Sequence, residues 1–175
     1  MNWNFSTGVF QCRLPVAGDD NNALLSLLGK QNQLNHIPRL ALENMDQVED
    51  ELRRMVMRFE NREAAFWLIE GQYDQQVFAR ISIQKINWMM LSAQLQWELT
   101  PECTLDTLQA VLPDLLSFIF TELGLHRLEL RLVKGSLYEG WPEQLGFSAE
   151  GVLPQQQEFE GKDVDLAVYS RLATD

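Results

Sequence analysis

Residues that build metal centres and disulfides are scarce in this sequence. Its 175 residues include only two cysteines and two histidines. Cys12 and Cys103 lie far apart in the chain and form no CxxC pair. Neither His36 nor His126 has a cysteine or carboxylate partner at the spacing of metal ligands. We therefore expect no metal and two reduced thiols, which is the usual state of cysteines in a cytoplasmic protein.

Long apolar runs and basic residues are also few. No stretch approaches the roughly 20 apolar residues that cross a bilayer, and the first residues lack the basic and apolar regions of a signal peptide. The 14 basic residues are outnumbered by 25 acidic ones, which gives a formal net charge of −11. This charge argues against binding to nucleic acid or to an anionic membrane and favours an amine substrate or a basic protein partner. A negative surface can also serve solubility alone.

The apolar pattern predicts a single α/β domain over residues 1–175. Apolar residues recur every three or four positions over 45–59, and Asn44 with Gln47 should form the capping pair that begins this helix. Alternation of apolar and polar residues predicts an antiparallel meander and a final hairpin. The expected strands are 9–14, 66–69, 77–84, 91–99, 126–133, 147–153 and 163–172, and the other expected helices are 23–28 and 105–123.

The stretch 94–147 contains the central crossover of the predicted fold. A strand leads through a loop into a helix with regularly spaced leucines, and a second strand follows. Because a helix joins the strands 91–99 and 126–133, they should be parallel. Pro113 should bend the helix without ending it, since the apolar period continues beyond it. This plan is that of an anion-binding crossover, but the loop before the helix contains no glycine.

Several strings in order along the chain resemble the GNAT acyltransferases, in particular the branch that N-acetylates ribosomal proteins. The strongest is 122–131, Glu-Leu-Gly-Leu-His-Arg-Leu-Glu-Leu-Arg, which resembles that branch's helix end and fifth strand. The strings 145–152 and 159–169 resemble its last two strands. The resemblance implies a mixed, mostly antiparallel sheet of six or seven strands, flanked by helices, with a central parallel pair. It also implies transfer of acetyl from acetyl-CoA to an amine of a small molecule or a protein N-terminus.

The resemblance places the acetyl-CoA pyrophosphate at the start of the helix, where this sequence departs from the family. The family uses a Gln/Arg-x-x-Gly-x-Gly/Ala loop, whose glycines let backbone amides approach the phosphates. The matching positions are Cys103, Thr104, Leu105, Asp106, Thr107 and Leu108. Two leucines replace the expected glycines, and Asp106 adds a negative charge. The alternative is an ordinary helix start that Thr104 caps.

The resemblance also implies positions for the general base and acid. Spacing puts Gln94 at the base position of the fourth strand, and an amide cannot take up a proton at neutral pH. Glu98 is the nearest replacement, directly or through a water; the alternative is an exposed carboxylate at a strand end. After the fifth strand, the family has an Asn that contacts the cofactor and a Ser that acts as the general acid. The matching positions in this sequence are Gly135 and Tyr138. Tyr138 can protonate a leaving thiolate, and the alternative is an aromatic ring that packs beside Trp141.

Two functions are consistent with these residues. The first is an acetyl-CoA-dependent N-acetyltransferase, monomeric or homodimeric, in which Tyr138 and Glu98 are catalytic while Gly135 and residues 103–108 hold the cofactor. The second is a GNAT-fold interaction or regulatory module that has lost acetyl-CoA binding, since every departure falls at a cofactor or catalytic position. A fold alone does not choose between them.

Overall fold

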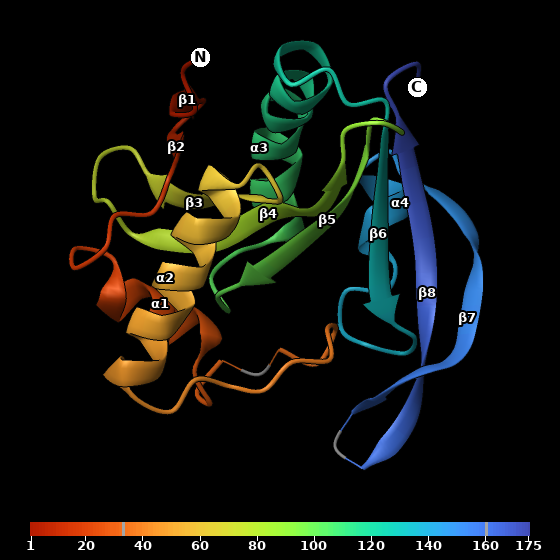
Figure 1. Ribbon diagram of the computed structural model, residues 1–175, viewed down its shortest axis with the longest axis horizontal. Coiled ribbons are helices and arrows are strands. Elements are labelled where there is room, and N and C mark those ends of the chain that lie inside the picture. The colour runs from red at the N-terminus through yellow and green to blue at the C-terminus, as the bar shows by residue number, and fades with distance from the viewer. Residues whose placement is uncertain (33, 160) are drawn as a thin grey trace.

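The computed structural model describes residues 1–32, 34–159 and 161–175, and a mixed sheet runs through it with helices on both faces (Figure 1). The described residues form eight strands in the order β1-β2-β3-β4-β5-β6-β8-β7. The strands are β1 Phe5–Thr7, β2 Phe10–Arg13, β3 Ala65–Gly71, β4 Val77–Asn87, β5 Ser92–Leu99, β6 Arg127–Val133, β7 Ser148–Phe159 and β8 Lys162–Leu172. The helical segments are α1 Asn21–Leu28, α2 Met45–Glu60, α3 Leu105–Ser117, the π-helix η1 Phe118–Glu122 and α4 Trp141–Gln144.

The predicted α/β class and strand pairings are confirmed. β3, β4 and β5 are antiparallel neighbours, β5 and β6 are parallel, and β7 forms an antiparallel pair with β8. The described sheet has eight strands instead of six or seven, because the N-terminal segment forms two short strands where one was predicted. Gly8, with φ at 61°, lies in the turn between them, and Phe5 pairs with Cys12.

The two faces of the sheet carry different helices and therefore different side chains. α3 packs on one face, and α1 and α2 pack on the other. Because side chains alternate along a strand, Leu95 and Trp97 of β5 point into the core under α3. Gln96 and Glu98 point to the face of α1 and α2, where polar residues gather near the centre of the sheet. None of the described helices is long and apolar enough to cross a membrane.

Helix boundaries follow the signals in the sequence. At the start of α2 the Gln47 amide donates to Asn44 Oδ1 at 3.0 Å, and Gln47 Oε1 accepts from the Glu43 amide at 2.7 Å. α3 continues past Pro113 and leads directly into η1, so the prediction of one helical segment is confirmed. Its buried leucines hold the segment against the sheet despite the missing amide donor.

The parallel strands β5 and β6 separate towards their carboxyl ends. Their pairing runs from Ser92 opposite Arg127 to Leu95 opposite Leu130. Beyond that point β5 continues over residues 96–99 and β6 over residues 131–133 without pairing with each other. We call the opening between these two ends the splay. It lies where ligands bind in open α/β sheets, outside the carboxyl ends of parallel strands.

Candidate functional site

The splay is crossed by the segment between α1 and α2. Asn32 Nδ2 donates to the Leu99 carbonyl at 2.7 Å. His36 contacts both strands, since its Nε2 lies 2.7 Å from the Trp97 carbonyl oxygen and its own carbonyl accepts from the Val133 amide at 2.8 Å. We call Asn32 and His36 together the His36 bridge. The bridge occupies backbone carbonyls to which an extended ligand would otherwise bond at an open strand edge.

His36 is held as a neutral, buried imidazole. Its side chain is fully buried, and a carbonyl oxygen can only accept, so Nε2 carries the hydrogen that Trp97 receives. Nδ1 then keeps its lone pair and has no partner among the described residues. Burial lowers the pKa of His36, and the hydrogen bond to Trp97 and the charge of Glu98 oppose this only in part. The fold therefore places at the splay a basic nitrogen, His36 Nδ1, that has no partner among the described residues.

Acid should destabilise this protein from about pH 6.5 downward because of His36. The folded pKa lies below the ordinary value of 6.5, so the unfolded state binds more protons as the pH falls. The stability from neutral His36 is complete above pH 6.5 and is lost as the pH falls towards the folded pKa. The resulting slope is at most about 1.4 kcal/mol per pH unit. Urea unfolding between pH 7.5 and 5.5 measures it.

The His36→Gln variant tests this assignment, because glutamine keeps a donor for Trp97 but does not titrate. Its stability should depend less steeply on pH than that of the wild type. His126→Gln is the control, since it removes an exposed imidazole in place of the buried one. An unchanged slope in His36→Gln would contradict the assignment.

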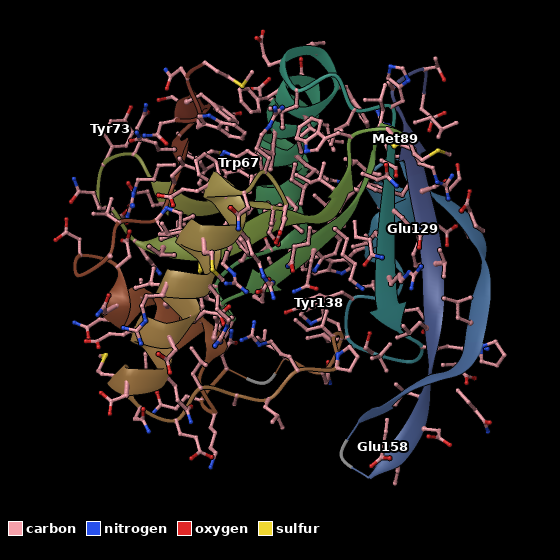
Figure 2. All side chains as sticks on the ribbon, in the orientation of Figure 1. Trp67, Tyr73, Met89, Glu129, Tyr138 and Glu158 are labelled. Carbon is pink, nitrogen blue, oxygen red and sulfur yellow. The ribbon has the colours of Figure 1, made fainter. Side chains whose placement is uncertain are left out.

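Tyr138 packs beside His36 at the mouth of the splay. Its ring meets the His36 ring edge-on at 4.8 Å between centroids, and the Trp141 ring lies 4.6 Å away. Figure 2 shows Tyr138 between the carboxyl ends of β5 and β6. The residue is only 7% exposed, and no hydrogen bond joins its hydroxyl to a described residue. Burial, and secondarily Cys103 nearby, raises the pKa of Tyr138, so the hydroxyl stays protonated at neutral pH.

Glu98 lies inside the protein in an ion-pair network and is not an exposed carboxylate at a strand end. Glu98 is 0% exposed, and its Oε1 accepts from Arg80 Nε at 2.9 Å and from Arg80 Nη2. Arg80, which is 1% exposed, also donates to Glu51 at 2.9 Å, and Arg39 lies 3.7 Å from Glu98. The contact with Arg80 stabilises the charged carboxylate and makes Glu98 a structural anchor. The alternative of an exposed Glu98 is therefore wrong.

The start of α3 is a capped helix with two free backbone amides. The Thr107 amide donates to Thr104 Oγ1 at 3.3 Å, and the Thr104 amide donates to Thr107 Oγ1 at 3.5 Å. The Leu108 amide bonds to the Thr104 carbonyl. The amides of Leu105 and Asp106 have no partner among the described residues. They are the groups that can face an anion here.

Not every large side chain at the start of α3 faces the site where an anion could bind. Leu108 is buried in the core beneath α3, and Cys103 is also buried. Burial raises the pKa of the Cys103 thiol to about 12, so it is an unreactive thiol at neutral pH. Asp106 is exposed and remains the one negative charge in the first turn.

Three solved structures resemble the whole chain. The ribosomal-protein-S5-alanine acetyltransferase of Vibrio fischeri has a TM-score of 0.83 at 14% identity, covering 99% of this chain and 98% of that one. The fold is that of the GNAT acetyltransferases. A spermidine N-acetyltransferase of Vibrio cholerae, solved with CoA and spermine, has a TM-score of 0.81 at 19% identity over 95% and 96% of the two chains. A probable acetyltransferase has a TM-score of 0.83 at 18% identity over 98% and 97%. No model of a protein family matches the sequence, and no curated protein matches it.

Within this GNAT fold, His36 brings two of the predicted site residues close to one place. Tyr138 touches its ring, and the charge of Glu98 acts on its imidazole. Gly135 lies in an exposed turn, with φ at 81° and its amide donating to Glu139 at 3.0 Å. Thr104, Leu105 and the rest of 103–108 form the capped start of α3 described above.

Sequence reasoning missed His36 and Arg80. The segment around His36 has no clean apolar period, and its partner Trp97 is 61 residues away, so no local pattern marks it. Arg80 lies in the predicted strand 77–84, and the alternation there does not show that α2 covers this face of the sheet with Glu51. An arginine in a strand of alternating polar and apolar residues fits an exposed side chain as readily as a buried pair, so the sequence gives no sign of its burial.

Proposed function

We propose that this protein is an acetyl-CoA-dependent N-acetyltransferase acting on the amine of a small molecule or a protein N-terminus. The observation that carries the proposal is the splay, which opens near the start of α3 with Tyr138 and His36 at its mouth. The three neighbours described above are all acetyltransferases by description, and one was solved with CoA. They lend no support to the alternative of a module without cofactor binding.

The residues fit acetyl-CoA at both ends of the splay. At one end, the free amides of Leu105 and Asp106 begin a 13-residue helix, whose dipole favours a phosphate. At the other end, the Tyr138 hydroxyl holds a proton. Between the two ends, Asn32 Nδ2 takes the carbonyl of Leu99, so a ligand that bonds to this carbonyl requires the Asn32 side chain to move.

The chain's own side chains divide the proton transfers between them. Bound acetyl-CoA supplies an acetyl thioester that an amine can attack. His36 Nδ1, neutral and without a partner among the described residues, can accept a proton from the incoming amine. The Tyr138 hydroxyl can donate a proton to the departing sulfur. In this assignment Glu98 keeps its bond to Arg80 and acts on His36 only through its charge.

Acetyl-CoA binding measured by calorimetry tests the proposal. We expect a dissociation constant in the micromolar range. Because binding would displace Asn32, the Asn32→Ala variant should bind no more weakly than the wild type. No detectable binding at millimolar acetyl-CoA would overturn the proposal and favour the alternative, an interaction or regulatory module that does not bind the cofactor.

The Asp106→Asn variant should bind acetyl-CoA about 2–5-fold more tightly than the wild type. Removing a negative charge beside the free amides relieves repulsion of the phosphates at an exposed site, an effect of roughly 0.3–1 kcal/mol at low salt. Asp114→Asn is the matched control, since Asp114 is exposed on the same helix two turns further on. Equal affinities in wild type and Asp106→Asn would show that the phosphates bind elsewhere.

A further inference from the structure

A polar cleft of about 180 Å³ lies beside the His36 bridge on the sheet face that carries α2. Its floor comes from β4, β5 and β6, Leu166 of β8 also lines it, and one wall is the chain that directly follows His36. The polar side chains that line it are Gln84, Lys85, Gln94, Gln96, Arg131 and Arg39. Of these residues, only Gln94 was singled out from the sequence, as the residue at the general-base position that cannot take up a proton.

Strand register sets the glutamines and the arginine side by side. Gln84 pairs with Gln94 across β4 and β5, and Gln94 lies opposite Glu129 of β6. Gln96 and Arg131 are each two residues further along their strands and so share the same face. Neighbouring strands are about 4.8 Å apart, so side chains from two strands can hold one small ligand.

These side chains offer hydrogen-bond donors that the protein does not use. Arg131 Nε donates to Glu129 Oε1 at 2.5 Å, which orients the guanidinium, and its terminal nitrogens have no partner among the described residues. The ammonium group of Lys85 forms no ion pair with a described residue. The side-chain amides of Gln94 and Gln96 make no hydrogen bond within the described part of the chain.

The lining is cationic in a protein whose net charge is −11. Arg39, Lys85 and Arg131 line the cleft, and no carboxylate does. Arg39 lies near Glu51 and Glu98, and Arg131 pairs through Nε with Glu129, labelled on β6 in Figure 2. Lys85 is the lining cation that has no ion pair among the described residues, and the terminal nitrogens of Arg131 stay available. A guanidinium end with two free nitrogens matches a carboxylate, and an adjacent ammonium adds to the attraction. A polyamine would instead meet like charge.

We propose that the cleft binds the carboxylate of a small amine such as an amino acid. If the proposed acetyltransferase function holds, this molecule is the acetyl acceptor. Gln96 is next to Trp97, and residues 37–39 follow His36, so the cleft lies beside the splay. A carboxylate held by Arg131 and Lys85 leaves the amine end free to point towards His36 and Tyr138.

Binding of free amino acids by the wild-type protein tests the proposal directly. L-amino acids, their carboxamides and spermidine are titrated by calorimetry, each with and without CoA. At least one amino acid should bind, and its carboxamide should bind at least 10-fold more weakly, since it lacks the carboxylate. Carboxamide binding as tight as that of the acid, tighter binding of spermidine, or no amino acid binding at all would overturn the proposal.

Variants locate the binding in the cleft. Arg131→Gln and Lys85→Gln should each weaken amino-acid binding several-fold or more, and Lys85 is exposed, so its variant should fold. Arg127→Gln is the matched control: Arg127 lies on the same strand and face but pairs with Glu150 outside the cleft. Equal weakening in Arg127→Gln, or none in either cleft variant, would contradict the site.

The two proposals fail separately in this design. If amino-acid binding depends on Arg131 but acetyl-CoA does not bind, the cleft proposal stands and the acetyltransferase proposal is wrong. If the protein transfers acetyl to spermidine in preference to every amino acid, the acetyltransferase proposal stands and the cleft is not the acceptor site.

Discussion

Replacing Arg80 by methionine is expected to lower the free energy of unfolding by about 3–5 kcal/mol. Arg80 is the shared partner of two carboxylates, Glu98 and Glu51, and it is 1% exposed. Without it, the charge of Glu98 stays buried, and Arg39 at 3.7 Å is the cation that remains beside it among the described residues. Burial alone would raise the pKa of Glu51, but the charges of Arg80 and Arg39 lower it to about 2, which shows how strongly the network favours the charged form.

Urea unfolding at pH 7 measures this loss. The control is Arg53→Met, because Arg53 pairs with Asp50 on the exposed face of α2 and should change stability by less than about 1 kcal/mol. The double variant Arg80→Met with Glu98→Leu should recover part of the loss, since it removes the buried charge together with its partner. A loss in Arg80→Met as small as in Arg53→Met would show that the network contributes little.

Replacing Tyr138 by phenylalanine should lower kcat for acetyl transfer about 10²–10⁴-fold, the usual contribution of a positioned general acid. The hydroxyl is the only group removed, and it bonds to no described residue, so the ring packing on His36 and Trp141 remains. Stability and acetyl-CoA affinity should therefore stay close to those of the wild type. Steady-state kinetics, with calorimetry and thermal unfolding on the same samples, separate these effects.

Tyr73→Phe is the control for the loss of a phenol, because Tyr73 is 85% exposed and far from the splay in Figure 2. Burial raises the pKa of Tyr138 above its ordinary value of 10, so the hydroxyl keeps its proton through neutral pH. Deprotonation of Tyr138 should therefore not lower kcat below pH 10. A Tyr138→Phe enzyme with undiminished kcat would leave the aromatic ring as a packing residue only.

Most of the fold was predictable because it depends on patterns within short segments. The Asn44 cap, the helix through Pro113 and the final hairpin each rest on residues close together in the chain. The count of strands was wrong at the N-terminus, where β1 and β2 are too short to show a period. Tyr138 was named through its match to a family position after the fifth strand, and the structure places it beside His36 at the splay.

The candidate site was less predictable because its contacts join distant segments. Glu98 could be placed on a strand, but its burial depends on Arg80 of β4 and on α2 covering that face. The two leucines at the start of α3 suggested a blocked anion site, yet Leu108 turns into the core. The cleft between Gln94, Gln96 and Arg131 arises from strand register, which no single segment specifies.

The sequence by itself determined the α/β class, the order of helices and strands, and the parallel crossover at β5 and β6, since local periodicity and connection lengths allow little else. Only the tertiary structure decided what lies in the opening of that crossover. His36 reaches both strands from a segment without a pattern, and Glu98 becomes an anchor because Arg80 meets it inside the protein. Burial and long-range pairing set the chemistry of these groups, and both are properties of the folded chain.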